Sequence, residues 1–265
     1  MNRAPIDAPR LRSSLATPAP AFYDRIDVVE STGSTNADLV ARAADPAVDR
    51  QALLAEEQVR GRGRHARTWV SPPRAQISLS ILVRLPGIDP GALGWLPLLT
   101  GIAVVDAVRG TAGVAPELKW PNDVLLDGRK LSGILAEVAA TGVAPAVVVG
   151  IGLNVDLDEA ELPVPHATSL RLAGAANLDR TALVAAILTE FARRFTAWER
   201  AGWASDELAA AYRERCATLG VEVRAELPGG KTVTGVATGI DDTGRLLIGA
   251  EAVSAGDVSH LRGQY

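Results

Sequence analysis

Cysteine is almost absent from this chain of 265 residues, with Cys216 as its single instance. One cysteine excludes a disulfide within the chain, and we interpret it as a small buried apolar residue rather than a nucleophile. Histidine is also scarce, and none of His65, His166 and His260 has a ligand-like spacing to cysteine, aspartate or glutamate. A structural zinc site is therefore not predicted.

Long apolar runs and a broad basic composition are missing as well. No stretch of about 18 consecutive apolar residues marks a transmembrane helix, and residues 1–20 lack the apolar core of a signal peptide. The formal net charge of −4 leaves no general cationic surface that could release counterions from nucleic acid. We therefore expect a cytoplasmic protein that binds neither membrane nor DNA.

Changes in composition and in the pattern of apolar residues along the sequence favour one large domain followed by a small one. Residues 1–21 are rich in proline, alanine, serine and arginine, and we expect a disordered tail there. From Leu219 onward, short alternating segments are separated by glycine turns, which is typical of a small SH3-like β-barrel. We predict a large domain at 22–215 and a small one at 216–265.

Apolar periodicity predicts both strands and helices in the large domain. The stretch 77–83 alternates strictly, which predicts a strand with one strongly buried face. The other expected strands are 26–29, 53–56, 118–120, 124–126, 130–138 and 146–155, with a hairpin turn at Asp127-Gly128. Helices are expected at 37–44, 92–109, 181–200 and 205–215.

The strongest local signal is the loop Arg60-Gly61-Arg62-Gly63-Arg64-His65-Ala66-Arg67. Guanidinium groups this close together repel one another unless an anion is bound, and the glycines give the backbone freedom to approach it. A bound phosphate or carboxylate is the favoured interpretation. On this segment alone, a solvated surface loop and a nucleic-acid contact stay open.

Polar groups also gather at the start of the first expected helix and at the end of one strand. Thr35, followed three residues later by Asp38, fits a capping box, so Ser34-Thr35-Asn36 is either a helix cap or a binding site. Lys119-Trp120-Pro121-Asn122-Asp123 holds a lysine and a carboxylate in different directions, although Pro-Asn-Asp is also ordinary turn chemistry.

Glycines interrupt two of the expected strands. Strict alternation places Lys130 on one face with Ser132 and Ile134, and Gly133 on the other, where a ligand or another backbone could approach closely. A merely solvated Lys130 is the alternative. Gly150-Ile151-Gly152-Leu153-Asn154 lacks the third glycine of a dinucleotide fingerprint, and we expect its glycines to admit a flat ring or a neighbouring backbone. No Walker spacing is present, which excludes a P-loop.

Taken in chain order, these segments resemble the biotin protein ligases, that is, the biotin–acetyl-CoA-carboxylase ligases. The resemblance spans about residues 26–262. It rests on Ser34-Thr35-Asn36, Gln58, Gly61-Arg62-Gly63-Arg64-His65-Ala66-Arg67-Thr68-Trp69, Lys119-Trp120-Pro121-Asn122-Asp123, Arg129-Lys130-Leu131-Ser132-Gly133-Ile134-Leu135 and Gly150-Ile151-Gly152-Leu153-Asn154. The related lipoate ligases share the fold but not the arginine loop and the Lys-Trp-Pro-Asn-Asp motif in this form.

The resemblance implies an α+β fold, with a mixed β-sheet catalytic domain flanked by helices and a small C-terminal SH3-like barrel. It implies the short form of the family, because the leading 20 residues are too short for the winged helix-turn-helix of some members. We therefore expect no DNA binding, and a monomer or a weak homodimer.

The implied activity is that of an ATP-dependent ligase. It would join biotin to ATP as biotinyl-5′-AMP, release pyrophosphate, and transfer biotin to a specific lysine of the biotin carboxyl carrier domain of acyl-CoA carboxylases. Mg²⁺ would accompany ATP, bound through phosphates and water, so that no protein ligand is identified. The arginine loop would close over the adenylate and shield it from water.

The resemblance also implies roles for individual residues. Those expected to bind biotin are Ser34, Thr35, Asn36, Gln58, Arg62, Gly63, Arg64 and Lys130. Those expected to bind ATP or the adenylate are Arg64, Arg67, Trp69, Lys119, Asn122 and Asn154. The catalytic groups would be Lys130, Lys119, Arg62 and Asp123, with Asp123 orienting or deprotonating the incoming lysine.

Three other functions compete with this one. A biotin-binding module without catalysis would be favoured by loss of Lys130 or of the loop arginines, yet both are present. Transfer of lipoate or octanoate would favour a longer apolar tunnel than the bicyclic head of biotin needs. A nucleic-acid-binding role has only the loop charge and the small barrel in its favour.

Overall fold

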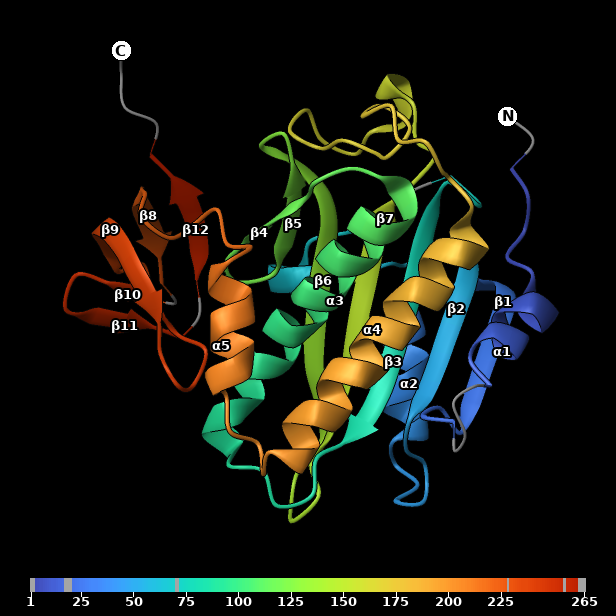
Figure 1. The fold of residues 1–265 in the computed structure, drawn as a ribbon, viewed down its shortest axis with the longest axis horizontal. Coiled ribbons are helices and arrows are strands. Elements are labelled where there is room, and N and C mark those ends of the chain that lie inside the picture. The colour runs from blue at the N-terminus through green and yellow to red at the C-terminus, as the bar shows by residue number, and fades with distance from the viewer. Residues whose placement is uncertain (1–2, 17–20, 70–71, 228, 255, 262–265) are drawn as a thin grey trace.

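The large sheet of the protein is mixed and seven-stranded, and it carries helices on both faces (Figure 1). The computed structural model describes residues 3–16, 21–69, 72–227, 229–254 and 256–261. The strand order is β1 (Arg25–Thr32), β2 (Gln51–Gln58), β3 (Gln76–Arg84), β7 (Ala146–Asn154), β6 (Arg129–Ala140), β5 (Asp123–Leu126) and β4 (Glu117–Lys119). Among the described strands of this sheet, β1 and β2 form the one parallel pair, and helix α2 (Thr35–Arg42) provides the crossover between them.

Helices α3 (Trp95–Ala112) and α4 (Arg180–Arg200) cover one face of this sheet, and α2 covers part of the other (Figure 1). Strand β3 is consequently buried on both faces, whereas its alternation predicted one buried face. Ile77, Leu79 and Ile81 pack in the main core, while Leu82 packs in a second cluster with Leu39 of α2. The expected strands and helices of the large domain are otherwise confirmed.

The segment Pro90–Ala112 is long and apolar enough to cross a membrane by length and composition alone. It consists of the 3₁₀ turn η2 (Pro90–Gly94) and helix α3. Of the most apolar 18-residue stretch in this segment, 67% is buried inside the protein, where α3 packs against α4 and the sheet. A buried core helix accounts for its composition.

The C-terminal sheet is antiparallel and lies beside helix α5 (Asp206–Arg213) (Figure 1). Its order is β11 (Glu251–Val253), β10 (Leu246–Ile248), β9 (Thr232–Ile240), β8 (Glu222–Glu226) and β12 (Asp257–His260). The pairings among described residues leave this sheet open, so the closed barrel expected from the sequence is not formed by them. The division at residue 216 stays a prediction.

Trp120 anchors the C-terminal sheet to the large one. Its backbone N–H donates to the Thr218 hydroxyl (3.0 Å), and its indole N–H donates to the Gly244 carbonyl (3.0 Å). The chain leaving α5 also pairs with β4, where the Leu118 N–H donates to the Arg215 carbonyl (2.7 Å). These contacts fix β12 next to the strand ends that carry the polar motifs.

The expectation of a disordered tail is wrong for the described N-terminal residues. Helix α1 (Ala8–Ser14) packs against α4, and Leu11 is fully buried. The Asp7 side chain caps the helix by accepting from the Arg10 N–H, and Pro9 suits the first turn. Composition hid this helix, because its apolar residues are few and its partners lie far away in sequence.

Candidate active site

One cavity of about 750 Å³ is lined by all the residues that the sequence predicts to bind substrate or take part in catalysis. It lies where the ends of β2, β6 and β7, the arginine loop and β12 meet. The nominated residues that line it are Ser34, Thr35, Asn36, Gln58, Arg62, Gly63, Arg64, Arg67, Trp69, Lys119, Asn122, Asp123, Lys130 and Asn154. Segments separated by more than 90 residues thus form a single site.

One wall of the cavity is a chain of buried hydrogen bonds. The Gln58 side-chain oxygen Oε1 accepts from the Thr35 N–H (2.9 Å) and hydroxyl (3.0 Å). The Ser80 hydroxyl lies 2.7 Å from the Thr35 hydroxyl and donates to Asn36 Oδ1 (2.6 Å). The Asn36 amide then donates to the Leu135 carbonyl (3.1 Å) and to Glu137 (2.7 Å). Each side chain is fixed by its neighbours, which suits recognition of a small polar ring.

The helix cap predicted at Thr35 is wrong by one residue. The N-cap of α2 is Ser34, whose hydroxyl accepts from the Ala37 N–H (3.5 Å). Thr35 is helical, and its hydroxyl points to Gln58 and Ser80 instead. Asp38 accepts from the Thr32 hydroxyl (2.5 Å) rather than completing a capping box. Ser34 therefore serves as the cap while also lining the cavity, which Thr35 and Asn36 line as well.

The glycines of β7 admit a flat indole ring at Gly152, as predicted, and at Gly150 a side-chain amide in place of the predicted ring or backbone. A Cβ at Gly152 would overlap the Trp69 indole, and one at Gly150 would overlap the Asn36 amide. Trp69 lies flat in this space, and its indole N–H donates to Gln76 (2.7 Å). Asn154, at the end of the same strand, is buried and donates to the Thr168 carbonyl (2.9 Å).

Lys130 reaches the cavity because of a β-bulge. Val124 pairs with Ser132 but Leu125 pairs with Lys130, so the intervening residue is left out of the ladder. The bulge turns Lys130 to the face of Gly133, whereas strict alternation placed it with Ser132 and Ile134. Its ammonium lies 2.5 Å from an Asp123 carboxylate oxygen and 5.8 Å from the Trp69 ring centroid. This carboxylate fixes where the Lys130 charge points.

The arginine loop spans from the large sheet to the C-terminal sheet. The Arg62 side chain contacts Glu137 (3.3 Å), and Arg67 pairs with Asp257 of β12. Arg64 donates to the Asn122 side chain (2.9 Å) and to the Gly256 carbonyl (3.2 Å), which are both neutral acceptors. Burial lowers the pKa of the Arg64 guanidinium, but an arginine keeps its proton at neutral pH.

Known proteins share both parts of the chain. Residues 28–154 match the Biotin/lipoate A/B protein ligase family, and residues 218–261 match the Biotin protein ligase C terminal domain. The chain is 48% identical to the biotin–acetyl-CoA-carboxylase ligase of Mycobacterium tuberculosis, over 98% of this chain and 97% of that protein. The chain belongs to the biotin protein ligase family. The C-terminal match also supports the SH3-like assignment of the small domain.

Further relatives agree with this family. A biotin–acetyl-CoA-carboxylase ligase of Paracoccus denitrificans is 34% identical, over 86% of this chain and 97% of that protein. Among solved structures, the biotin protein ligase from Aquifex aeolicus in complex with biotin and ATP superposes with a TM-score of 0.75, at 26% identity, over 91% of this chain and 100% of that one. A biotin protein ligase therefore has the same mixed sheet and C-terminal sheet.

Several cavity residues of this family member were missed from its sequence. Ser80 joins Thr35 to Asn36, but it was assigned only to a strand face. Residues 257–260 of β12 also line the cavity, and their sequence carries no recognisable motif. Ser80 could have been found from the alternation of β3, since it falls on the face opposite the apolar residues. The contribution of β12 has no signal in the sequence.

No metal cluster is present in the part of the chain that the structure describes. No group of three or more His, Cys, Asp or Glu side chains there could hold a metal ion.

Proposed function

We propose that this protein is an ATP-dependent biotin–carboxyl-carrier-protein ligase. It activates biotin as biotinyl-5′-AMP with release of pyrophosphate, and it transfers the biotinyl group to one lysine of the biotin carboxyl carrier domain of acyl-CoA carboxylases. The observation that carries the proposal is the single cavity in which a wall of fixed hydrogen bonds meets Lys130, Arg62, Arg64 and Lys119. The chain aligns with nearly the full length of two relatives that are named for this activity.

The hydrogen-bonded wall forms the proposed biotin pocket. The Thr35, Asn36, Gln58 and Ser80 groups already hold one another in place, so a polar bicyclic head can exchange hydrogen bonds with them at little entropic cost. A long apolar tunnel is not what this wall offers, which favours biotin over lipoate. Arg62, Gly63 and Arg64 would close over the biotin carboxylate.

The chemical difficulty of the first step is the meeting of two anions. The biotin carboxylate attacks the α-phosphate of ATP, and pyrophosphate leaves with the negative charge. Lys130, fixed by Asp123 at 2.5 Å, would stabilise the charge that develops at the α-phosphate. Arg62, Arg64 and Lys119 would supply further positive charge, and no covalent protein nucleophile is required.

The nucleotide would occupy the part of the cavity between β7 and the arginine loop. Trp69 offers a flat ring on Gly152, and Arg67, Asn122 and Asn154 supply polar groups around it. The Asn122 side chain already accepts from Arg64, so we expect it to act partly by holding that guanidinium. Mg²⁺ would arrive with ATP, held by phosphates and water. Loop ordering on ligand binding stays a prediction.

In the second step, the carrier lysine attacks the carbonyl carbon of the mixed anhydride and AMP leaves. Asp123 would orient that lysine or accept its proton.

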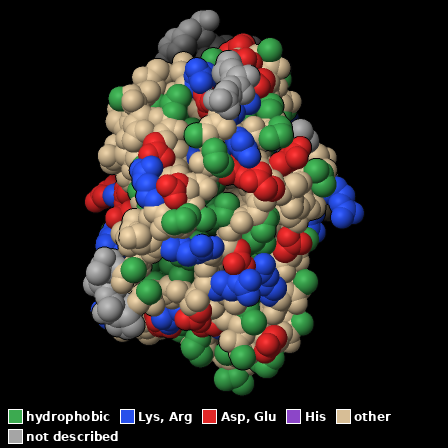
Figure 2. All heavy atoms as spheres, turned by 90° about the vertical axis from the view of Figure 1, so that its right-hand side faces the viewer, with side chains coloured by type: hydrophobic (Ala, Val, Ile, Leu, Met, Phe, Trp, Pro, Cys, Tyr) green, Lys and Arg blue, Asp and Glu red, His purple; other side chains and the backbone are tan. Residues whose placement is uncertain are grey.

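The face that includes the β1 edge has acidic and basic side chains interspersed, with no broad basic area (Figure 2). We propose a cytoplasmic protein, a monomer or weak homodimer, that engages carrier domains rather than DNA or membranes.

The complete reaction is tested by incubating the protein with ATP, biotin, Mg²⁺ and a biotin carboxyl carrier domain. We expect the carrier to gain one biotinyl group, because the cavity brings both activating and accepting groups together. Intact-mass measurement detects the product, and a carrier whose target lysine is replaced by arginine serves as the matched control. An unmodified carrier, or equal labelling of the arginine carrier, would sink the transfer step.

A further inference from the structure

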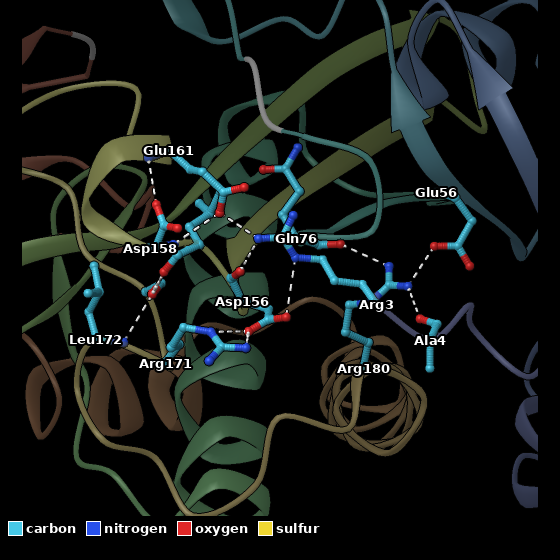
Figure 3. Close-up of polar contacts among 12 residues, drawn as sticks. Arg3, Ala4, Glu56, Gln76, Asp156, Asp158, Glu161, Arg171, Leu172 and Arg180 are labelled. Atoms are coloured by element: carbon cyan, nitrogen blue, oxygen red, sulfur yellow. Dashed lines mark hydrogen bonds and ion pairs between the residues drawn. The ribbon is translucent and has the colours of Figure 1, made fainter. Parts of the chain in front are cut away.

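The N-terminal strap, residues 3–7, contacts β2, α4 and the segment after β7. The Ile6 N–H donates to Glu56 of β2 (2.5 Å), and the Asp7 N–H donates to the Thr181 hydroxyl of α4 (3.0 Å). The Ala4 carbonyl accepts from Arg180 of α4 (2.7 Å). Figure 3 shows Arg3 and Ala4 of the strap close to Glu56 of β2, Arg180 of α4 and Asp156 of the segment after β7.

A buried ion pair lies beneath the strap. The Glu56 and Arg180 side chains are 2% and 6% exposed, and their charged atoms are 2.7 Å apart. A buried pair is stable only when its remaining hydrogen-bonding groups are satisfied. The strap supplies these partners, because Ile6 donates to the carboxylate and Ala4 accepts from the guanidinium.

Glu56 and Arg180 also hold the two ends of the segment 56–76, which contains the arginine loop. The Glu56 carbonyl accepts from the Arg74 N–H (2.9 Å), and the Gln76 carbonyl accepts from Arg180 (3.2 Å). The Gln76 side chain in turn accepts from the Trp69 indole (2.7 Å). The strap is therefore linked, through polar contacts of Arg180 and Gln76, to Trp69 of the proposed nucleotide site.

Arg3 links the strap to a second wall of the cavity. Its guanidinium donates to the Asp156 carboxylate (3.2 Å), the Asp156 carbonyl (2.6 Å) and Glu161 (2.5 Å). These acceptors belong to the 155–168 loop, which follows β7 and contributes Pro163, Val164, His166 and Ala167 to the cavity. The Arg3 side chain is only 8% exposed, so its guanidinium is held in place against these acceptors.

The 155–168 loop also holds Lys130 from its backbone. The Lys130 N–H donates to the His166 carbonyl (2.8 Å), and the Lys130 carbonyl accepts from the Thr168 N–H (2.8 Å). A displacement of this loop would therefore shift the Lys130 backbone as well as the cavity wall. Arg3 thus holds one part of the loop, at Asp156 and Glu161, and the other end of the same loop holds the proposed catalytic lysine.

We propose that Arg3 is a positioning residue, which fixes the 155–168 loop so that the cavity wall and Lys130 are placed for ATP. This inference rests on the proposed function. Arg3 lies outside the cavity lining and touches no substrate there; it acts through Asp156 and Glu161. Its loss should weaken use of ATP while leaving the biotin wall of Thr35, Asn36 and Gln58 intact.

The test compares Arg3→Ala with Arg171→Ala. Arg171 pairs with the same Asp156 carboxylate, but it is 40% exposed and lies outside the strap. In biotin-dependent ATP–pyrophosphate exchange, we expect Arg3→Ala to raise the KM for ATP about tenfold with the KM for biotin nearly unchanged. Arg171→Ala should match the unaltered protein, and Arg3→Lys, which retains the charge but not the fork, should lie between.

Amide hydrogen exchange on the ligand-free protein provides a second measurement. We expect faster exchange at residues 157–167 in Arg3→Ala but not in Arg171→Ala. Equal behaviour of the two variants in both measurements would overturn the proposal, as would a lower melting temperature of Arg3→Ala with an unchanged KM for ATP. Absence of any exchange activity in the unaltered protein would instead refute the proposed function, while the hydrogen-exchange contrast would still test the strap.

Discussion

Replacing Lys130 with alanine is expected to lower the rate of biotin-dependent ATP–pyrophosphate exchange by about a thousandfold. The variant removes the ammonium that Asp123 holds 2.5 Å away, in the cavity where the carboxylate and the α-phosphate must meet. Because no covalent nucleophile shares this task, the loss should be mainly in kcat. Initial-rate exchange at saturating biotin and ATP measures it.

The matched control is Lys231→Ala, since Lys231 is exposed on the C-terminal sheet and pairs with Glu251. It should leave the exchange rate unchanged. Lys130→Ala also leaves Asp123 without its partner, so Lys130→Ala with Asp123→Asn separates a lost charge from an unpaired carboxylate. An exchange rate for Lys130→Ala within about tenfold of the unaltered protein would contradict the role assigned to Lys130.

Two single-methyl substitutions on β7 should separate the two substrates. In Gly150→Ala the new methyl would overlap Asn36, which Ser80, Leu135 and Glu137 hold in place, so the KM for biotin should rise. In Gly152→Ala the methyl would overlap the Trp69 ring, so the KM for ATP should rise. Overpacking of this kind costs about 1–3 kcal/mol, which is roughly a tenfold to hundredfold change in KM.

The exchange assay, run with each substrate varied in turn, gives both KM values. Gly110→Ala is the control, because Gly110 lies in α3 with nothing within 4 Å of an added Cβ. It should be kinetically silent and slightly more stable to heat. If Gly150→Ala and Gly152→Ala raised the same KM, the division of the cavity into a biotin side and a nucleotide side would be wrong.

The proposed site could be predicted from the sequence because its polar groups lie in short contiguous motifs. Each motif stands at the end of an element whose apolar pattern is clear, as with Gln58 at the end of β2 and Asn154 at the end of β7. Strand ends on one edge of a sheet bring such groups together. The glycines of β7 were also interpretable, because a buried strand tolerates a missing side chain only where something else fills the space.

Other parts of the structure depend on contacts that no local pattern encodes. The bulge before Ser132 reverses the face of Lys130, and a one-residue shift of this kind has no signature in an alternating sequence. The N-terminal segment and its helix were missed because their partners are distant in sequence: Arg3 contacts Asp156, 153 residues away, and Arg10 of α1 contacts Asp179, 169 residues away. The contribution of β12 likewise depends on docking of the C-terminal sheet through Trp120.

The central claim is that the cavity activates biotin with ATP, and the exchange of labelled pyrophosphate into ATP tests it most directly. The unaltered protein is supplied with ATP, Mg²⁺ and pyrophosphate, and either biotin or lipoate is added. The account predicts rapid exchange with biotin, and none above background with lipoate or without either acid. Exchange supported by lipoate but not by biotin would contradict the account.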